Sequence, residues 1–168
     1  MRRQSQRQAL WLLCLLLPTT VFAQRIHHEE HESRHEIAIF TGVTTEPEHN
    51  ESFFTIGGEY EFRFLPRLGI SVELEYIKGL DAGVFAFPVV FHVHKGLMFV
   101  AGPGWETSPR EIEALGDKRD FLFRVGVQYS FHVGGRFALM PAVDFDFVKR
   151  EHETEKLFVF GVKFAWGL

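Results

Sequence analysis

Residues 52–64 constrain the fold of this chain more than any other stretch, because their side chains alternate strictly between two kinds of surface. One face is apolar and aromatic almost throughout, and it carries Phe54, Ile56, Gly58, Tyr60, Phe62 and Phe64. The opposite face is largely polar, and it carries Phe53, Thr55, Gly57, Glu59, Glu61 and Arg63. A period of two residues indicates a β-strand, since successive side chains of a strand point to opposite faces of its sheet.

The same alternation recurs along the chain and defines eight predicted strands. They cover residues 36–45, 52–64, 68–78, 82–93, 96–105, 120–131, 136–148 and 157–168. Most are about as long as the roughly 9–11 residues that a tilted strand needs to cross a lipid bilayer. The first, fourth and fifth runs alternate less clearly, and Pro88 and Pro103 each remove a backbone donor. An even number of strands lets a sheet close with both ends at one rim, so we predict an all-β, antiparallel, up-and-down barrel of eight transmembrane strands.

The aromatic face is predicted to point outward, toward lipid. The chain contains 19 phenylalanines, and the aromatic face recurs in phase in several strands, which gives more apolar surface than the core of one small soluble domain needs. After the N-terminal segment no run of 18 apolar residues occurs, which disfavours a helical membrane protein. The charged face is therefore predicted to line the inside of the closed barrel.

The first 23 residues have the pattern of a secretory signal peptide. Arg2, Arg3 and Arg7 form a basic region, residues 9–17 are apolar, and residues 21–23 resemble a cleavage site. The alternative is a retained membrane anchor, for which the apolar run is short. The single cysteine, Cys14, lies inside this segment and does not follow a small residue, so neither a lipid anchor nor a disulfide is expected in the exported chain.

Residues 24–35 are predicted to form an exposed polar tail before a barrel domain at 36–168. The tail carries His27, His28, His31 and His35 among glutamates, a composition that suits a transition-metal ion if the segment orders around it. The plainer alternative is a solvated tail. Without the three arginines of the signal segment, the 18 basic residues fall to 15 against 22 acidic ones, a net charge of −7 that disfavours a nucleic-acid partner.

The connections between the predicted strands differ between the two rims. Tight, punctuated turns are predicted at 65–67, 94–95 and 132–135, and longer charged loops at 46–51, 79–81, 106–119 and 149–156. Short turns at one rim and longer loops at the other are typical of outer-membrane barrels, in which the short turns are periplasmic. A capping box at residues 108–111 predicts a short helix near 109–115 within the longest loop.

Together these features resemble the small eight-stranded outer-membrane β-barrels of the OmpA and OmpX-like group. Members of that group carry a C-terminal assembly signal made of a glycine and two in-phase hydrophobic residues, and Gly161, Phe164 and Trp166 match its spacing. The chain departs from the pattern by ending on Leu168 and by having Val159 where a polar residue is usual. The resemblance implies a fold and a bacterial outer-membrane location, with outer-membrane lipids, lipopolysaccharide and the barrel assembly machinery as partners.

The inward face of the predicted barrel carries a set of charged residues. They are Glu59, Glu61, Arg63, Glu73, Glu75, Arg124, Asp144, Asp146 and Lys163. An eight-stranded barrel is just wide enough for its own side chains, and buried charges without partners are costly, so we predict a paired network that fills the lumen. Counting from the strand ends puts Glu59, Glu73, Arg124 and Lys163 near mid-depth. The alternative reading of the same residues is a pair of catalytic carboxylates or a proton path.

Three other functions are open alternatives to a structural or surface-interaction barrel. A lipid-modifying enzyme would use a serine and a histidine, and Ser130 and His132 lie two apart on one strand face, although at the periplasmic rim. A narrow channel would conduct through the lumen, and a soluble lipocalin-like barrel would bind a small ligand. His92, His94 and His132 at one rim are a further possible metal site. We expect a monomer without a cofactor, and no catalysis.

Overall fold

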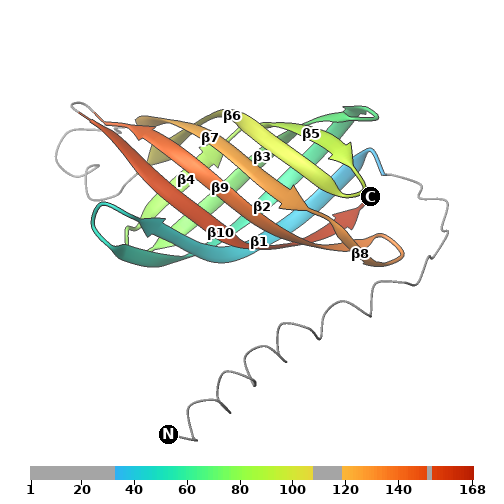
Figure 1. The fold of residues 1–168 in the computed structure, drawn as a ribbon, viewed down its shortest axis with the longest axis horizontal. Coiled ribbons are helices and arrows are strands. Elements are labelled where there is room, and N and C mark those ends of the chain that lie inside the picture. Colours follow the sequence, from blue (N-terminus) through green and yellow to red (C-terminus); the bar gives the residue numbers. More distant parts are fainter. Residues whose placement is uncertain (1–32, 108–118, 151–152) are drawn as a thin grey trace, which may run out of the picture. The chain divides into compact units, whose positions relative to one another are not determined.

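The computed structural model describes residues 33–107, 119–150 and 153–168, which form one all-β unit (Figure 1). Among these residues there is no helix, and hence none long and apolar enough to cross a membrane. The predicted signal peptide, most of the predicted tail and the predicted helix at 109–115 lie outside the described residues.

The described residues form one closed antiparallel sheet of ten strands that wrap around a common axis (Figure 1). The strands are β1 (His35–Glu46), β2 (Glu51–Leu65), β3 (Leu68–Lys78), β4 (Ala82–Ala86), β5 (Val89–His94), β6 (Leu97–Thr107), β7 (Arg119–Tyr129), β8 (Phe131–Gly134), β9 (Phe137–Lys149) and β10 (Thr154–Gly167). β4 with β5, and β7 with β8, each occupy one position of the wall, so the barrel has eight positions. The predicted eight-stranded antiparallel barrel is confirmed.

Two predicted strands are interrupted where the sequence removes or redirects a backbone donor. Pro88 separates β4 from β5, and Ser130 separates β7 from β8. Pairing continues across the first break, because Ser71 donates its backbone N–H to the carbonyl of Pro88 at 2.9 Å. The inward phase also continues, since Ala86, Pro88 and Val90 are all buried. The interruptions therefore change the strand count without changing the barrel.

β1 and β10 close the barrel, and we call this pair the closure seam. They pair over ten positions, from Glu36 opposite Gly167 to Thr45 opposite Phe158. At the centre of the seam Gly42 lies opposite Gly161, and a Cβ on Gly161 would fall 2.6 Å from the Cα of Gly42. The ring of Phe40 points inward over both glycines, which explains why an aromatic residue of β1 is buried. The seam thus depends on two residues that lack side chains.

The two rims of the barrel differ less than the sequence predicted. The turn rim has the connections 66–67, 95–96 and 135–136. The start of β1 and the end of β10 also lie at this rim, where Glu36 is opposite Gly167. At the loop rim the connections are 47–50, 79–81, 108–118 and 150–153. The strands thus run further than predicted at this rim, and the loops predicted at 46–51 and 149–156 are shortened to four residues each. The predicted strands ended too early because charged residues at the strand ends resemble loop residues. In the structure these residues continue the alternation, and Glu46 keeps the inward phase.

Burial follows the predicted alternation, with polar residues inside and aromatic residues outside. β9 gives the clearest example, in which exposed and buried residues alternate over all 13 positions. The inward face also carries two clusters of buried apolar residues. One contains Ala38, Val90, Met98, Val100, Ala138, Met140 and Ala165, and the other contains Ile77, Ala82, Val84, Leu122, Val148 and Leu157. The lumen is therefore occupied by side chains, as expected for eight strands.

Candidate functional site

Arg124 of β7 is the centre of a network of charges in the lumen. Its side chain is 0% exposed and contacts three carboxylates from β3 and β9. Nε and Nη2 donate to the two oxygens of Asp146 at 2.8 and 2.7 Å. Nη1 donates to Glu73 and to Glu75, each at 2.6 Å, and Nη2 donates to the second oxygen of Glu75 at 2.9 Å. Planar, two-pronged contacts of this kind are the strongest ion pairs that arginine makes.

Lys163 of β10 extends the network toward β2. Its ammonium group donates to Glu59 and, at 3.4 Å, to Oε1 of Glu73. Glu73 therefore contacts both bases, through Oε2 to Arg124 and through Oε1 to Lys163. We call Glu59, Glu73, Glu75, Arg124, Asp146 and Lys163 the lumen network. The four residues that the sequence placed near mid-depth all belong to it.

Strand register explains why these residues meet. Glu59 lies directly opposite Glu73 in the β2–β3 pair, and Arg124 lies directly opposite Asp146 in the β7–β9 pair. Two carboxylates facing each other would repel, so the position of Lys163 between them offsets a like-charge pair. The network thus joins opposite walls of the barrel through side chains alone.

Asp144 is buried beside this network, in space left by a glycine. It lies opposite Gly126, and a Cβ on Gly126 would fall 1.7 Å from Oδ1 of Asp144. A side chain at position 126 is therefore incompatible with the observed position of Asp144. The pair shows that small residues on the inward face make room for large polar residues across the ladder.

The remaining predicted lumen residues, Glu61 and Arg63, lie apart from the lumen network, near the turn rim. Oε1 of Glu61 lies 2.7 Å from Nε2 of His92 and 3.7 Å from Nε of Arg63. Glu61 is 3% exposed, so His92 is a partner for a buried carboxylate. Of the three histidines considered for this rim, His92 is thus engaged by Glu61, while His94 and His132 are exposed.

A second arginine-centred group lies at the loop rim and was not predicted. Arg150 follows β9 and contacts Asp120 at 2.7 Å, Glu155 at 2.8 Å and Glu106 at 3.1 Å. Partial burial lowers the pKa of Arg150, but the neighbouring carboxylates of Glu106 and Glu155 outweigh that effect and raise it above its usual value. We call these four residues the loop-rim cluster. The signal that would have found it is register, since Glu106 lies directly opposite Asp120.

The other predicted site residues are dispersed. His27, His28 and His31 lie outside the described residues, whereas His35 is the first residue of β1, where its Nδ1 lies 2.7 Å from the hydroxyl of Tyr60. Gly161 faces the lumen at the closure seam, and Phe164 and Trp166 are exposed on the outside of β10. Ser130 is half-buried between β7 and β8, and His132 is exposed on β8. The predicted assembly signal therefore divides between the two faces of one strand.

Comparison with solved structures identifies the fold. The chain is similar to the N-terminal β-barrel domain of Pseudomonas aeruginosa OprF, with a TM-score of 0.59, 10% identity, and coverage of 80% of this chain and 100% of that one. It is also similar to the Yersinia pestis outer membrane protein Ail, with a TM-score of 0.54, 11% identity, and coverage of 78% and 99%. For Neisserial surface protein A the values are 0.53, 9%, 80% and 96%.

These three structures are small eight-stranded barrels, so the resemblance inferred from the sequence is confirmed at the level of the fold. No protein-family model matches the sequence, and no curated protein sequence matches it significantly. At identities near 10%, the shared property is the barrel architecture.

Proposed function

We propose that this chain is an integral outer-membrane β-barrel whose lumen is filled by its own side chains, and that it has a structural or surface-interaction role. The observation that carries the proposal is the reversed distribution of polarity. Buried positions include Arg124, Lys163 and six carboxylates of the lumen, whereas the outside carries a broad set of exposed aromatic residues. Among them are Phe54, Tyr60, Phe62, Phe64, Tyr76, Phe91, Phe99, Trp105, Phe121, Phe123, Tyr129, Phe137, Phe145, Phe160, Phe164 and Trp166.

This distribution favours a lipid environment over water. A soluble lipocalin-like barrel has apolar residues inside and polar residues outside, which is the opposite arrangement. Exposed apolar patches larger than a few hundred Å² are rare on soluble monomers. Exposed aromatic residues occur at seven of the eight wall positions, and β1 contributes the exposed Ile37 and Ile39 instead. The apolar surface is therefore a continuous band. A bilayer is the partner that covers such a band.

The lumen supports a closed barrel rather than a wide pore. Arg124 is 0% exposed and its guanidinium group contacts three carboxylates, so it occupies the middle of the barrel as a fixed cross-link. Apolar clusters lie on the inward face in addition to the charges. A narrow channel is the second candidate, because a movement of Arg124 would change the charges along the barrel axis. Conduction is therefore the measurement that separates the two.

The proposed partners follow from the surfaces. Outer-membrane lipids and lipopolysaccharide would contact the aromatic band, and the barrel assembly machinery would recognise the C-terminal strand with Gly161, Phe164 and Trp166. Apart from the short β8, which pairs with β9, each strand pairs on both sides within the described residues. No long strand edge is left for another copy, which favours a monomer. Acidic residues inside and at the loop rim continue to disfavour nucleic acid.

We propose no enzymatic role. Ser130 lies at the break between β7 and β8 and His132 lies on β8, near the turn rim, which the proposed orientation places in the periplasm, away from the outer leaflet. The carboxylates of the lumen network are engaged by Arg124 and Lys163, so they are structural cross-links in this proposal rather than an acid and a base. Transfer of an acyl group from lipid A would contradict the proposal directly.

Fractionation of cells that express the full chain tests the location. We expect the protein in the outer-membrane fraction, resistant to carbonate extraction and with a heat-modifiable mobility in gels. A charged variant of the outer band, Phe123→Asp, should fold poorly in lipid, whereas Lys78→Asp at the loop rim should not. Recovery of the wild-type protein in the periplasmic extract without detergent would contradict the proposal.

Conductance in planar bilayers tests the closed lumen. We expect no steady channel from the wild-type barrel, because side chains fill its interior. Openings that appear in wild-type protein, and that increase when Arg124 is replaced by serine, would favour the channel instead. Preparations of the Phe123→Asp variant that fail to insert serve as the control for leaks caused by contaminants.

A further inference from the structure

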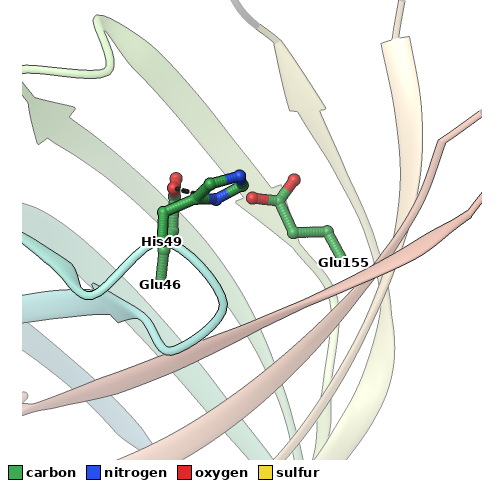
Figure 2. A group of neighbouring side chains, drawn as sticks. All are labelled: Glu46, His49 and Glu155. Atoms are coloured by element: carbon green, nitrogen blue, oxygen red, sulfur yellow. Dashed lines mark ion pairs between the residues drawn. The ribbon is translucent and has the colours of Figure 1, made fainter.

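Three residues that can bind a metal ion meet at the loop rim of the closure seam. They are Glu46, His49 and Glu155, and one ligand atom from each lies within 4.8 Å of the other two. Figure 2 shows the ring of His49 between the two carboxylates. Nδ1 of His49 lies 3.3 Å from Oε2 of Glu46. We call these three residues the seam site.

The seam site bridges the first and last strands of the barrel. Glu46 is the last residue of β1, and His49 lies in the connection 47–50 that follows it. Glu155 is the second residue of β10. The ladder between the two strands reaches Thr45 opposite Phe158, so the seam site lies just beyond the last paired position. A ligand bound there would join β1 to β10 where backbone pairing stops.

The burial of Glu46 is the second observation that points to a ligand. Glu46 is only 7% exposed, and among the described residues its polar side-chain contact is with His49. A buried carboxylate is costly unless a cation or several donors satisfy it. Glu155 lies close by and adds a second carboxylate, and its partner Arg150 is shared with Glu106 and Asp120. A cation between Glu46 and Glu155 would therefore stabilise the arrangement.

Glu155 is held in place while it keeps one oxygen available. Both contacts from Arg150, through Nε and Nη2 at 2.8 Å, are made to Oε2 of Glu155. Oε1 has no such contact with Arg150. Arg150 therefore acts as a positioning residue, which orients one carboxylate oxygen toward Glu46 and His49. An outer partner that orients a ligating group is a usual feature of metal sites.

We propose that Glu46, His49 and Glu155 bind a first-row divalent metal ion such as Zn²⁺. Imidazole nitrogen and carboxylate oxygen are suitable ligands, and three of them leave a fourth position for water. Zinc lies about 2.0–2.2 Å from such ligands, which puts neighbouring ligand atoms roughly 3.4 Å apart in a tetrahedral site. The side chain of His49 is 65% exposed and can make the adjustment of about 1 Å that this requires.

Protonated His49 is the competing source of the positive charge. An imidazolium ion between Glu46 and Glu155 would satisfy both carboxylates without a metal ion. The two possibilities differ in what they predict for added Zn²⁺. A metal site binds the ion at neutral pH, where imidazole is mostly uncharged, and a histidine ion pair does not need it.

Calorimetric titration of Zn²⁺ into the full chain, folded in detergent micelles, tests the proposal. The predicted tail is a second possible source of heat, so the reference protein carries His27→Ala, His28→Ala and His31→Ala. In this background we expect one equivalent of Zn²⁺ to bind. Glu46→Gln, His49→Ala and Glu155→Gln should each lower the affinity by at least about tenfold. Glu48→Gln and His94→Ala should leave it unchanged.

Thermal unfolding provides a second readout. A ligand that binds only the folded protein raises its midpoint, so Zn²⁺ should raise the temperature at which the reference protein loses its folded gel mobility. His49→Ala should abolish that rise, and because His49 is in an exposed connection this variant is expected to fold normally. Failure of the reference protein to bind Zn²⁺, or binding that is unaffected by His49→Ala, would overturn the proposal.

Discussion

The barrel contains two groups of the same composition in different surroundings. In the lumen, Arg124 contacts the three carboxylates of Glu73, Glu75 and Asp146. At the loop rim, Arg150 contacts the three carboxylates of Glu106, Asp120 and Glu155. The side chain of Arg124 is 0% exposed and that of Arg150 is 28% exposed. The two groups differ in burial and not in the number of ion pairs, so we expect the lumen group to contribute more to the stability of this barrel.

Arg124→Met gives the largest expected effect. Removal of the cation leaves three carboxylates in the lumen without their main partner, and breaking a buried pair in this way costs about 3–5 kcal/mol. We therefore expect a corresponding fall in the free energy of unfolding, measured by urea titration of the barrel in lipid vesicles. A loss below about 1 kcal/mol would show that water or protons compensate the carboxylates and that the comparison is wrong.

A compensated variant separates the charge effect from lost packing. In Arg124→Met combined with Glu75→Gln and Asp146→Asn, fewer buried charges lack a partner. Replacing a whole buried ion group is often neutral or stabilising, so much of the lost stability should return. If the triple variant were less stable than Arg124→Met alone, packing of the guanidinium group would be the more important contribution.

Lys163→Met is expected to have an intermediate effect, a loss of about 2–3 kcal/mol. Glu73 keeps its contact with Arg124, so Glu59 is the residue that loses its cation. Adding Glu59→Gln to Lys163→Met should therefore restore part of the stability, measured in the same urea titration. A double variant that is additive, with no restoration, would mean that Lys163 and Glu59 do not depend on each other.

Arg150→Met should have the smallest effect, about 1 kcal/mol, because the side chain of Arg150 is 28% exposed and solvent screens its ion pairs. The same measurement in roughly 1 M salt should reduce the difference further, since the screening length falls to about 3 Å. Salt should not reduce the effect of Arg124→Met to the same extent. Equal salt sensitivity of the two arginine variants would remove the distinction between the buried and the partly exposed arginine.

The sequence predicts the lumen better than the rim for a physical reason. Arg124 lies in the middle of a strand, where side chains of known phase on both sides fix its inward direction. Arg150 lies one residue after β9, where no alternation continues and the direction of the side chain depends on the turn. Glu46 and Glu155 were assigned to loops for the same reason, because charged residues at strand ends resemble loop residues. Alternation therefore identifies the face but not the end of a strand.

Partner choice within the lumen was also beyond the sequence. Period two places Glu59, Glu61 and Arg124 on one inward surface, but the stagger between strands determines which of them meet. Glu59 contacts Lys163, whereas Glu61 contacts His92. That stagger is a property of the closed sheet as a whole. A list of inward residues can thus be derived from one chain, and its pairing requires the three-dimensional register.

The closure seam has a consequence for how fast the barrel forms and opens. Every other wall pair joins neighbouring parts of the chain, whereas Ser33 and Leu168, which meet at the turn end of the seam, are 135 positions apart. Contacts between residues so far apart in the chain close a long loop, and the entropy cost of closing it delays their formation. The pairing of Gly42 with Gly161 is therefore expected to be the last event of folding and the first of unfolding. Gly161→Ala should then speed unfolding more than it slows folding, a ratio that stopped-flow kinetics in micelles can measure. The lifetime of the closed barrel would thus be determined by two glycines that have no side chain to contribute.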